Sequence, residues 1–388
     1  MLYRINILLP GSGHTPLGGY RVAYEYANGL AARGHHVTTI HPAMLCRNTP
    51  FTQRPKKTFR YFQRELDKSY RPNRWFTMDA NVKVEWVPSL HRDYIPPADI
   101  IIATAWQTAE WLPSYPVEAG KRLCLVYDFE HYMVGSPATR EHMAAVFAQR
   151  MKTISTSPAV SDMLRACGAN DTVYIPNGID FQVFFKDYEI NDPRRCAIGF
   201  PTRNESFKGT SDAIKALSIV RERSNRDLHF WSFGGRRPRC IPEWVEYYER
   251  PTDQALRKLY NQTLIFAVPS HYEGWGLPGA EAMSCGAALA STDNGGVRAY
   301  AEHMRNSLLS PPTVPEALAG NILRLLTDSN LRLTLAEQGL LDLRQFTWQR
   351  AVEALECVIN ESCLGTASRH SVLPDYQVSI AEAAKEHR

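Results

Sequence analysis

The sequence lacks cysteine pairs at the spacing of a metal or redox site. Its eight cysteines are scattered singly along 388 residues, and none stands in a Cys-x-x-Cys motif. This pattern does not indicate a zinc site. A chain of this length can bury sizeable cores without a disulfide framework. We therefore expect reduced thiols and a cytoplasmic setting.

Long apolar runs and strong net charge are also missing. The apolar stretch near the N-terminus, residues 5–9, is too short for the core of a signal peptide. No stretch approaches the ~20 apolar residues of a membrane span, so any membrane contact should be peripheral. The formal charge of +4 is too small to indicate nucleic acid as a partner, although it is compatible with an anionic ligand.

A complete dinucleotide fingerprint is absent as well. Gly11 and Gly13 are correctly spaced, but the third glycine of G-x-G-x-x-G would fall at residue 16, which is Pro16. A nicotinamide-dependent dehydrogenase is therefore a poor interpretation. The alternation of short apolar runs and amphipathic stretches nevertheless predicts an α/β chain with parallel sheets covered on both faces.

The predicted elements fall into two series. The first has strands over 5–9, 37–40, 82–87, 100–103, 123–126, 154–155 and 173–175, with a helix over 20–33. The second has strands over 197–200, 228–233, 264–269 and 287–291, with helices over 211–223, 254–261 and 315–327 and another beginning near Glu281. We expect an N-terminal domain over 1–180, a C-terminal domain over 181–361, and a tail over 362–388 that packs back on the N-terminal domain.

The strongest chemical signal lies between the third strand of the second series and the next helix. Glu273 precedes this helix and Glu281 lies inside it, while Gly274 and Gly276 allow a ligand to approach the backbone closely. Pro278 suits the first turn of a helix, whose free N–H groups favour an anion. Carboxylates accept hydrogen bonds from sugar hydroxyls, so the pattern indicates a phosphorylated polyhydroxyl ligand. The alternative is a capped turn in which Glu281 only complements the helix dipole.

These residues resemble the Glu–seven residues–Glu motif of retaining glycosyltransferases of family 4, which have the GT-B fold of two Rossmann-like domains facing across a cleft. The resemblance extends over most of the chain through shorter segments: Gly18-Gly19, residues 176–180, residues 207–209, Gly295-Gly296, residues 306–309 and residues 346–348. Residues 127–130 also resemble a segment of bacterial cell-surface rhamnosyltransferases in this family, which work in polysaccharide biosynthesis.

The resemblance implies a role for each matching donor-side residue. Glu281 would bind the ribose of the donor nucleotide, and Glu273 would contact the transferred sugar. The remaining donor-binding residues would present backbone N–H groups or positive charge: Gly18, Gly19, Arg203, Lys208, Gly274, Trp275, Gly276 and Leu277. The Trp275 ring could also pack on the sugar or the base. Arg203 is shifted from the family's usual arginine, so a surface arginine is its alternative, and an ordinary turn is the alternative for Gly18 and Gly19.

The acceptor side departs from the family. Many members carry a histidine where this sequence has Tyr127. Asp128, Glu130 or His131 could orient the acceptor instead, and we assign Asp128 and Glu130 with Glu273 as candidate catalytic residues. The alternative is an acidic turn held by caps or ion pairs.

Residues 51–76 form an unusual segment, in which basic residues interleave with aromatic ones and only Glu65 and Asp67 oppose them. One interpretation is a solvated loop. The other is a surface that docks an anionic acceptor, a lipid phosphate or a bilayer headgroup.

The expected activity is metal-independent, retaining transfer of a hexosyl group from a nucleoside-diphosphate sugar to a hydroxyl acceptor. The acceptor would be a glycan, a lipid-linked molecule or a small molecule, with no nucleic acid involved and no cofactor beyond the sugar nucleotide. The protein would be cytoplasmic, with or without peripheral contact to the inner face of the membrane. The alternatives are a sugar-nucleotide epimerase or a phosphorylase on the same fold, or a non-catalytic nucleotide-sugar-binding protein.

Overall fold

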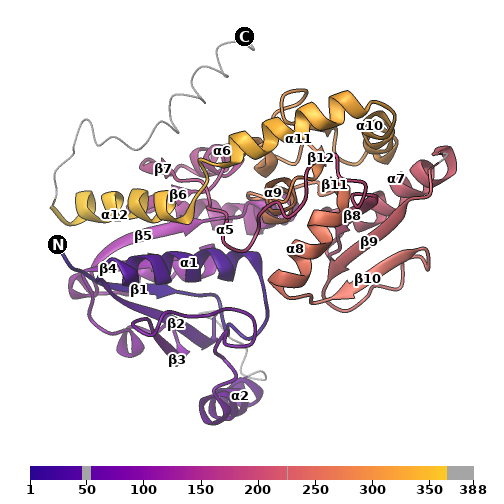
Figure 1. The fold of residues 1–388 in the computed structure, drawn as a ribbon. Helices are drawn as coiled ribbons and strands as arrows, with labels where there is room; N and C mark the ends of the chain where they lie inside the picture. Colours follow the sequence, from indigo (N-terminus) through magenta and orange to yellow (C-terminus); the bar gives the residue numbers. More distant parts are fainter. Residues whose placement is uncertain (46–53, 225, 365–388) are drawn as a thin grey trace.

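The chain forms two domains, each built on a parallel sheet (Figure 1). The computed structural model describes residues 1–45, 54–224 and 226–364. In this part of the chain the N-terminal sheet has seven strands in the order β3-β2-β1-β4-β5-β6-β7. Their bounds are β1 Arg4–Leu8, β2 His36–Met44, β3 Lys83–Ser89, β4 Ile100–Ala103, β5 Lys121–Val126, β6 Lys152–Ser155 and β7 Thr172–Tyr174.

The C-terminal domain repeats this plan. Its six described strands lie in the order β10-β9-β8-β11-β12-β13, again all parallel. The bounds are β8 Ala197–Pro201, β9 His229–Gly234, β10 Val245–Glu249, β11 Thr263–Val268, β12 Ala288–Thr292 and β13 Ser307–Ser310. The predicted α/β class with two Rossmann-like domains is therefore confirmed, although β10 and β13 were not predicted.

Helices cover both faces of each sheet because the strands are apolar on both sides. In β1, for example, Ile5 and Ile7 pack with α1 and α12, whereas Leu8 packs in the opposite core with α5 and α6. The helices are α1 Gly18–Ala32, α2 Arg54–Asp67, α3 Trp106–Ala109, α4 Glu130–Val134, α5 Pro137–Phe147, α6 Pro158–Ala166, α7 Thr210–Arg223, α8 Asp253–Gln262, α9 Leu277–Ser284, α10 Pro315–Thr327, α11 Ser329–Leu343 and α12 Trp348–Leu364.

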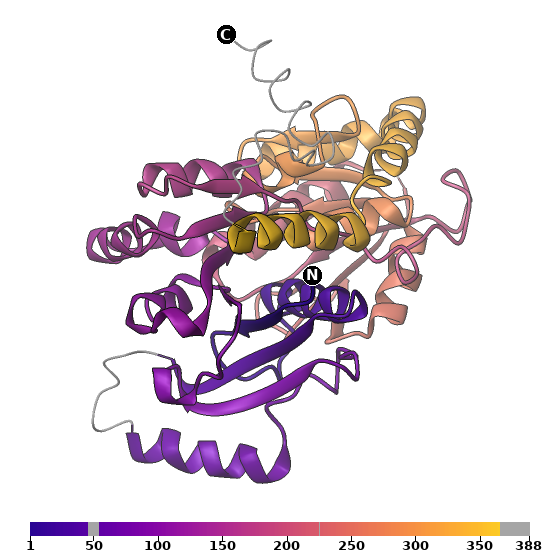
Figure 2. The same cartoon turned by 90° about the vertical axis from the view of Figure 1, so that its left-hand side faces the viewer.

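The chain crosses between the domains twice, at neighbouring points. The Ile179 N–H donates to the Phe346 carbonyl over 2.8 Å, and Ile179 also bridges to Thr347. After the second crossing, α12 lies alongside α1 (Figures 1 and 2). Its buried Val352 and Leu355 belong to the N-terminal core. The sequence-based boundary at residue 361 assigned this helix to the C-terminal domain, but the return to the N-terminal domain begins at Trp348. The predicted tail beyond residue 364 lies outside the described residues.

The basic and aromatic segment is helical where the structure describes it. Helix α2 spans Arg54–Asp67, so the expectation of a solvated loop is wrong for this part, while residues 51–53 lie outside the described residues. Across the described part of the chain, the helices are all too short or too polar to pass through a bilayer. The seven described cysteines are all free thiols.

Candidate active site

The Glu273–Glu281 motif forms a strand-to-helix turn in the C-terminal domain. Strand β11 ends at Val268 and α9 begins at Leu277, four residues before the predicted start at Glu281. Gly276 precedes the helix with φ +92°, a left-handed conformation that favours glycine. The Tyr300 hydroxyl donates to the Gly276 carbonyl over 2.8 Å and holds the turn in place. The turn at Gly276 therefore fixes the direction in which α9 begins.

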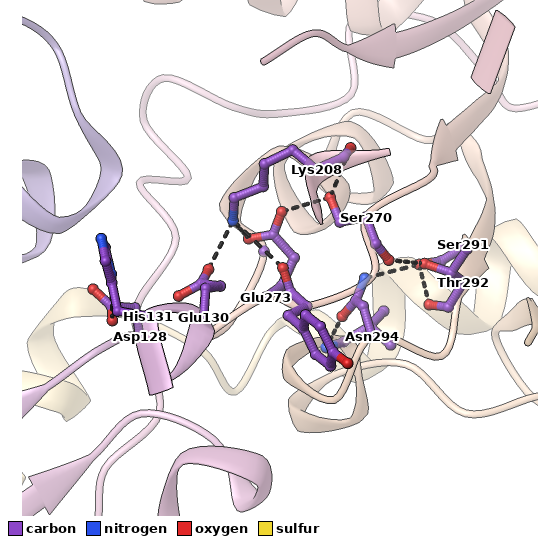
Figure 3. Close-up of polar contacts among 12 residues, drawn as sticks. Asp128, Glu130, His131, Lys208, Ser270, Glu273, Ser291, Thr292 and Asn294 are labelled. Carbon is purple, nitrogen blue, oxygen red and sulfur yellow. Dashed lines mark hydrogen bonds and ion pairs between the residues drawn. The ribbon is translucent and has the colours of Figure 1, made fainter. Parts of the chain in front are cut away.

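Both carboxylate oxygens of Glu273 have partners. The Ser270 hydroxyl donates to Oε1 over 2.7 Å, and Lys208 Nζ donates to Oε2 over 2.9 Å. The Glu273 backbone N–H donates to the Asn294 carbonyl over 3.0 Å. The position of this carboxylate is therefore fixed before any ligand binds (Figure 3).

Lys208 connects the two domains. Its side chain points between Glu273 and Glu130 (Figure 3), and Nζ lies 2.7 Å from Glu130 Oε1, which belongs to the first residue of α4 in the N-terminal domain. One ammonium group thus faces two carboxylates from opposite sides of the domain interface. Glu130 is buried, whereas Lys208 and Glu273 are half-buried, so a change of charge in this cluster is only partly screened by water.

Burial and charge oppose each other in this cluster. Burial raises the pKa of Glu130, and Asp128 and Glu273 add to the increase while Lys208 acts against it. For Lys208, burial alone would lower the pKa, but Glu273 and Glu130 together raise it above its usual value. The lysine is therefore a firmly charged ammonium, and Glu130 takes up a proton at a higher pH than an ordinary glutamate does.

Glu281 lies deeper in the same helix. Its Oε2 accepts a hydrogen bond of 3.2 Å from the Tyr260 hydroxyl, and the side chain is buried. Burial raises the pKa of Glu281 to about 7, with Arg21 of α1 opposing the increase. A carboxylate with spare acceptor positions in a buried site is suited to hydroxyl donors.

Arg21 places the N-terminal domain next to Glu281. Its Nη2 donates to both carboxylate oxygens of Asp253 in α8, at 2.7 Å to each. Both motif glutamates therefore face groups of the N-terminal domain: Glu273 through Lys208 and Glu130, and Glu281 through Arg21. They do not lie on separate surfaces.

Tyr127 fills the point where the domains meet. A Cβ atom on Gly274 would lie 1.8 Å from the Tyr127 carbonyl oxygen, and one on Gly19 would lie 2.2 Å from the Tyr127 ring. Any side chain at residue 274 would separate the backbones of the two domains. Gly18 lies in the same region, 3.8 Å from the Leu277 side chain by the same measure. The structure thus brings the predicted Gly18, Gly19, Gly274, Gly276 and Leu277 together.

Asp128 and His131 differ from Glu130, although the sequence offers all three as candidates. Asp128 Oδ1 lies 3.6 Å from His131 Nδ1, and both side chains point away from Lys208 (Figure 3). Donation of a hydrogen bond to the Asp128 carboxylate raises the pKa of His131, whose side chain is 62% exposed. Of the three, only Glu130 enters the charged cluster.

Two predicted donor-binding residues, Arg203 and Trp275, differ in where their side chains lie. Arg203 is exposed, and its charge opposes the rise in the pKa values of Glu281 and Tyr260 that burial causes, so it lies near Glu281 while its role in donor binding stays a prediction. Trp275 is only 2% exposed and packs on Tyr300 and Phe346 in the C-terminal core. The prediction that its ring stacks on a sugar or base is therefore wrong, and only its backbone remains available.

Sequence reasoning missed several supporting residues: Arg21, Tyr260, Ser270, Asn294 and Tyr300. Arg21 offered a signal, because a cation in the first turn of a helix opposes the helix dipole and needs a nearby acid. Tyr260, Asn294 and Tyr300 gave none, since their partners are distant in sequence or belong to the backbone, whereas Ser270 stands only three residues before Glu273.

Within residues 1–45, 54–224 and 226–364, no three His, Cys, Asp or Glu side chains meet in a group that could hold a metal ion. Metal independence itself stays a prediction.

Comparison with known proteins agrees with this architecture. Residues 195–328 match the family described as glycosyl transferases group 1. O-antigen chain mannosyltransferase B of Escherichia coli is 34% identical over 107 residues, which are 27% of each chain. The chain spans less than two thirds of the length of this and the other curated relatives it matches.

Solved structures extend the likeness to the whole fold. Sucrose-phosphate synthase from Thermosynechococcus elongatus superposes with a TM-score of 0.70 at 18% identity, covering 94% of this chain and 100% of that one. Anabaena HepE in complex with UDP-glucose superposes with a TM-score of 0.69 at 17% identity, covering 92% and 100%. The chain therefore has the GT-B fold, and its residues 195–328 are similar to the group 1 glycosyl transferases.

Proposed function

We propose that this protein is a retaining glycosyltransferase that moves a sugar from a nucleoside-diphosphate sugar to a hydroxyl acceptor. The observation that carries the proposal is the arrangement around α9. Glu273 and Glu281 stand on either side of one helix start, and Lys208 adds a half-buried positive charge next to Glu273. Hydroxyl acceptors and a phosphate-binding charge thus occur together at the domain interface.

The donor nucleotide would lie along the C-terminal domain. Glu281 would accept hydrogen bonds from ribose hydroxyls, while Arg203 and the start of α9 favour the diphosphate. The likeness to a HepE structure that contains UDP-glucose supports a nucleotide-sugar donor. The identity of the base and sugar is left open by this argument.

Lys208 would stabilise the leaving diphosphate. Its ammonium group is held by Glu130 and Glu273, a position that would lie next to the developing negative charge. A preorganised charge of this kind lowers the barrier without reorganisation during the reaction. As the sugar–phosphate bond breaks, the electron pair goes to the diphosphate, and Lys208 shifts its interaction toward that oxygen.

Glu273 would act at the sugar. Its carboxylate, fixed by Ser270 and Lys208, can bind a sugar hydroxyl and favour the positive charge that grows at the reacting carbon. Retention would follow from attack on the face that the diphosphate leaves, with the diphosphate taking the acceptor proton. This route needs no covalent intermediate on a carboxylate and no metal ion.

The acceptor would approach from the N-terminal domain. Glu130 is the best placed of the three candidates there, because it alone contacts Lys208. It would hold the acceptor hydroxyl or the sugar once the diphosphate has taken over Lys208. The acceptor remains a glycan, a lipid-linked molecule or a small molecule.

The first test is a ligand screen. UDP-, GDP- and dTDP-sugars would be compared by thermal stabilisation, because a ligand that binds the folded state raises its apparent stability. The stabilising donor is then incubated with candidate acceptors, and nuclear magnetic resonance assigns the anomeric configuration of the product. Retained configuration is expected, and addition of EDTA should leave the rate unchanged.

Glu273→Ala is the decisive variant. Transfer should fall about 10²–10³-fold, the usual effect of removing one transition-state charge partner, while the donor still stabilises the protein. Conversion of the donor alone would indicate an epimerase instead. Donor binding without turnover against any acceptor would indicate a binding protein. Near-wild-type transfer by Glu273→Ala would refute the proposed site.

A further inference from the structure

Helix α2 turns its large apolar side chains toward solvent. Phe59 is 69% exposed, Phe62 59% and Leu66 86%. Their spacing of three and four residues places them on one face of the helix. Figures 1 and 2 show α2 at the outer edge of the N-terminal domain, beyond β3. We call Phe59, Phe62 and Leu66 the outer face of α2.

The opposite side of the helix fixes this orientation. Tyr61 stacks on Trp86 of β3 with ring centroids 6.2 Å apart, and Trp86 Nε1 donates to the Tyr61 carbonyl over 3.0 Å. The Arg64 guanidinium group lies over the Trp86 ring at 5.7 Å. Because the polar and aromatic side holds the helix to the sheet, the outer face cannot rotate into the core.

The charge around the outer face has one dominant sign. Helix α2 contains five basic residues, Arg54, Lys56, Lys57, Arg60 and Arg64, against two acidic residues, Glu65 and Asp67. Both acids are already engaged, Glu65 with Lys68 at 2.7 Å and Asp67 with the Ser69 N–H at 2.8 Å. The composition of the helix therefore favours an anionic partner over a cationic one.

We propose that the outer face of α2 docks on an anionic phospholipid bilayer. Phe59, Phe62 and Leu66 would enter the boundary between headgroups and acyl chains, while Arg60 contacts a lipid phosphate. This combination of an apolar stripe and basic flanks is the pattern of interfacial helices. It also explains why a helix that packs firmly on its polar side leaves its apolar side uncovered.

The docking surface is connected to the Gly-rich loop that precedes α1. The segment after α2 is bonded to Gly13 twice: the Gly13 N–H donates to the Tyr70 carbonyl over 2.8 Å, and Trp75 Nε1 donates to the Gly13 carbonyl over 2.8 Å. If the proposed transferase function holds, docking would bring this loop to the membrane surface and favour a lipid-linked acceptor.

Co-sedimentation with vesicles tests the docking directly. Vesicles of phosphatidylcholine alone would be compared with vesicles that also contain phosphatidylglycerol. The wild-type protein should sediment with the anionic vesicles, less so at high salt. The variant Phe59→Ser/Phe62→Ser/Leu66→Ser should lose at least about tenfold in partitioning, since burial of each apolar side chain is removed. Arg60→Gln should lose about fivefold.

A matched control carries three exposed apolar residues from other surfaces: Val117→Ser/Val314→Ser/Leu341→Ser, with exposures of 87%, 40% and 51%. It should sediment like wild type. Thermal stabilisation by nucleoside diphosphates should be the same in all of these proteins, so failure of docking is distinguishable from failure of the donor site.

Three results would overturn the docking proposal. In the first, wild type ignores anionic vesicles. In the second, the triple variant of the outer face still sediments with them. In the third, sedimentation velocity shows a self-association that the triple variant abolishes while vesicles are not bound, which would make this face a contact between copies.

Discussion

The two halves of the candidate site are built in different ways. The C-terminal half is one continuous turn and helix, residues 270–281, held by Ser270, Tyr300 and the Asn294 backbone. The N-terminal half is assembled from separate short segments: the Gly18-Gly19 helix start, Tyr127 and Glu130. Lys208 joins the halves by pairing with a carboxylate from each. The C-terminal half is therefore held by its own contacts, whereas the N-terminal half depends on how separate segments pack together.

Removing the positive charge of Lys208 should have the largest effect on stability and turnover. Lys208→Met leaves Glu130 and Glu273 buried without a cation, which costs about 3–5 kcal/mol of stability. Turnover should fall on the order of 10²–10³-fold. Because ionised carboxylates cause the loss, the stability deficit should be full at pH 8 and shrink as pH falls and Glu130 takes up a proton. Melting curves against pH would measure this.

Lys215→Met is the control for this variant. The Lys215 side chain is 67% exposed and lies 4.0 Å from Asp212, so stability should change little at any pH. An equal loss in both variants would mean that the Lys208 cluster does not join the domains.

Gly274→Ala tests how closely the halves must meet. The new methyl group would lie 1.8 Å from the Tyr127 carbonyl oxygen, so the two backbones must separate. Misplacement of about 1 Å can cost about 10² in rate, and small-angle scattering should show a larger radius of gyration. Gly320→Ala is the control, because nothing lies within 4 Å of its added Cβ. That change should instead stabilise α10 by up to about 1 kcal/mol.

Glu281→Gln tests the donor half alone. Burial raises the pKa of Glu281 to about 7, so its ionised form destabilises the fold. This penalty is absent below the unfolded pKa of about 4.3, grows as pH rises, and is complete above pH 7, where it reaches about 3 kcal/mol. The variant should melt higher than wild type at pH 8 and similarly at pH 4, yet bind the donor nucleotide more weakly. A lower melting temperature at pH 8 would contradict the buried-charge account.

Asp128→Asn should have the smallest effect. Asp128 pairs only loosely with His131, at 3.6 Å near the surface, so the unfolding free energy should change by less than about 0.5 kcal/mol. The pKa of His131, which Asp128 raises, should fall toward its ordinary value, and nuclear magnetic resonance titration would detect this. A large loss of turnover would move the acceptor-orienting role from Glu130 to Asp128.

The same difference between the halves decides what the sequence could predict. Glu273, Gly274, Gly276 and Glu281 belong to one local pattern, and local patterns place residues on the same turn. The Lys208–Glu130 contact joins residues 78 positions apart, so only the packing of two domains reveals it. Trp275 was misjudged for a related reason, because the motif gives no sign of which side of the turn its ring occupies.

Helix α2 shows another limit. Sequence periodicity indicates an apolar face, but the usual inference places that face in the core. Here Trp86 and Tyr61 hold the polar side of α2 against the sheet, so Phe59 and Phe62 face solvent. The solvated loop, one of the two interpretations of this segment, was therefore wrong for the helix. Basic residues between the aromatic ones reinforced that error.

The route of the chain through α12 has a consequence for synthesis. Ala351, Val352, Leu355 and Ile359 complete an apolar layer whose other members belong largely to the first 175 residues. During synthesis, one side of α1 in the N-terminal domain therefore stays uncovered until α12, the last described helix, has been made. A nascent chain that stops just before residue 348 would contain every described strand of both sheets. It would still expose the apolar residues that α12 covers.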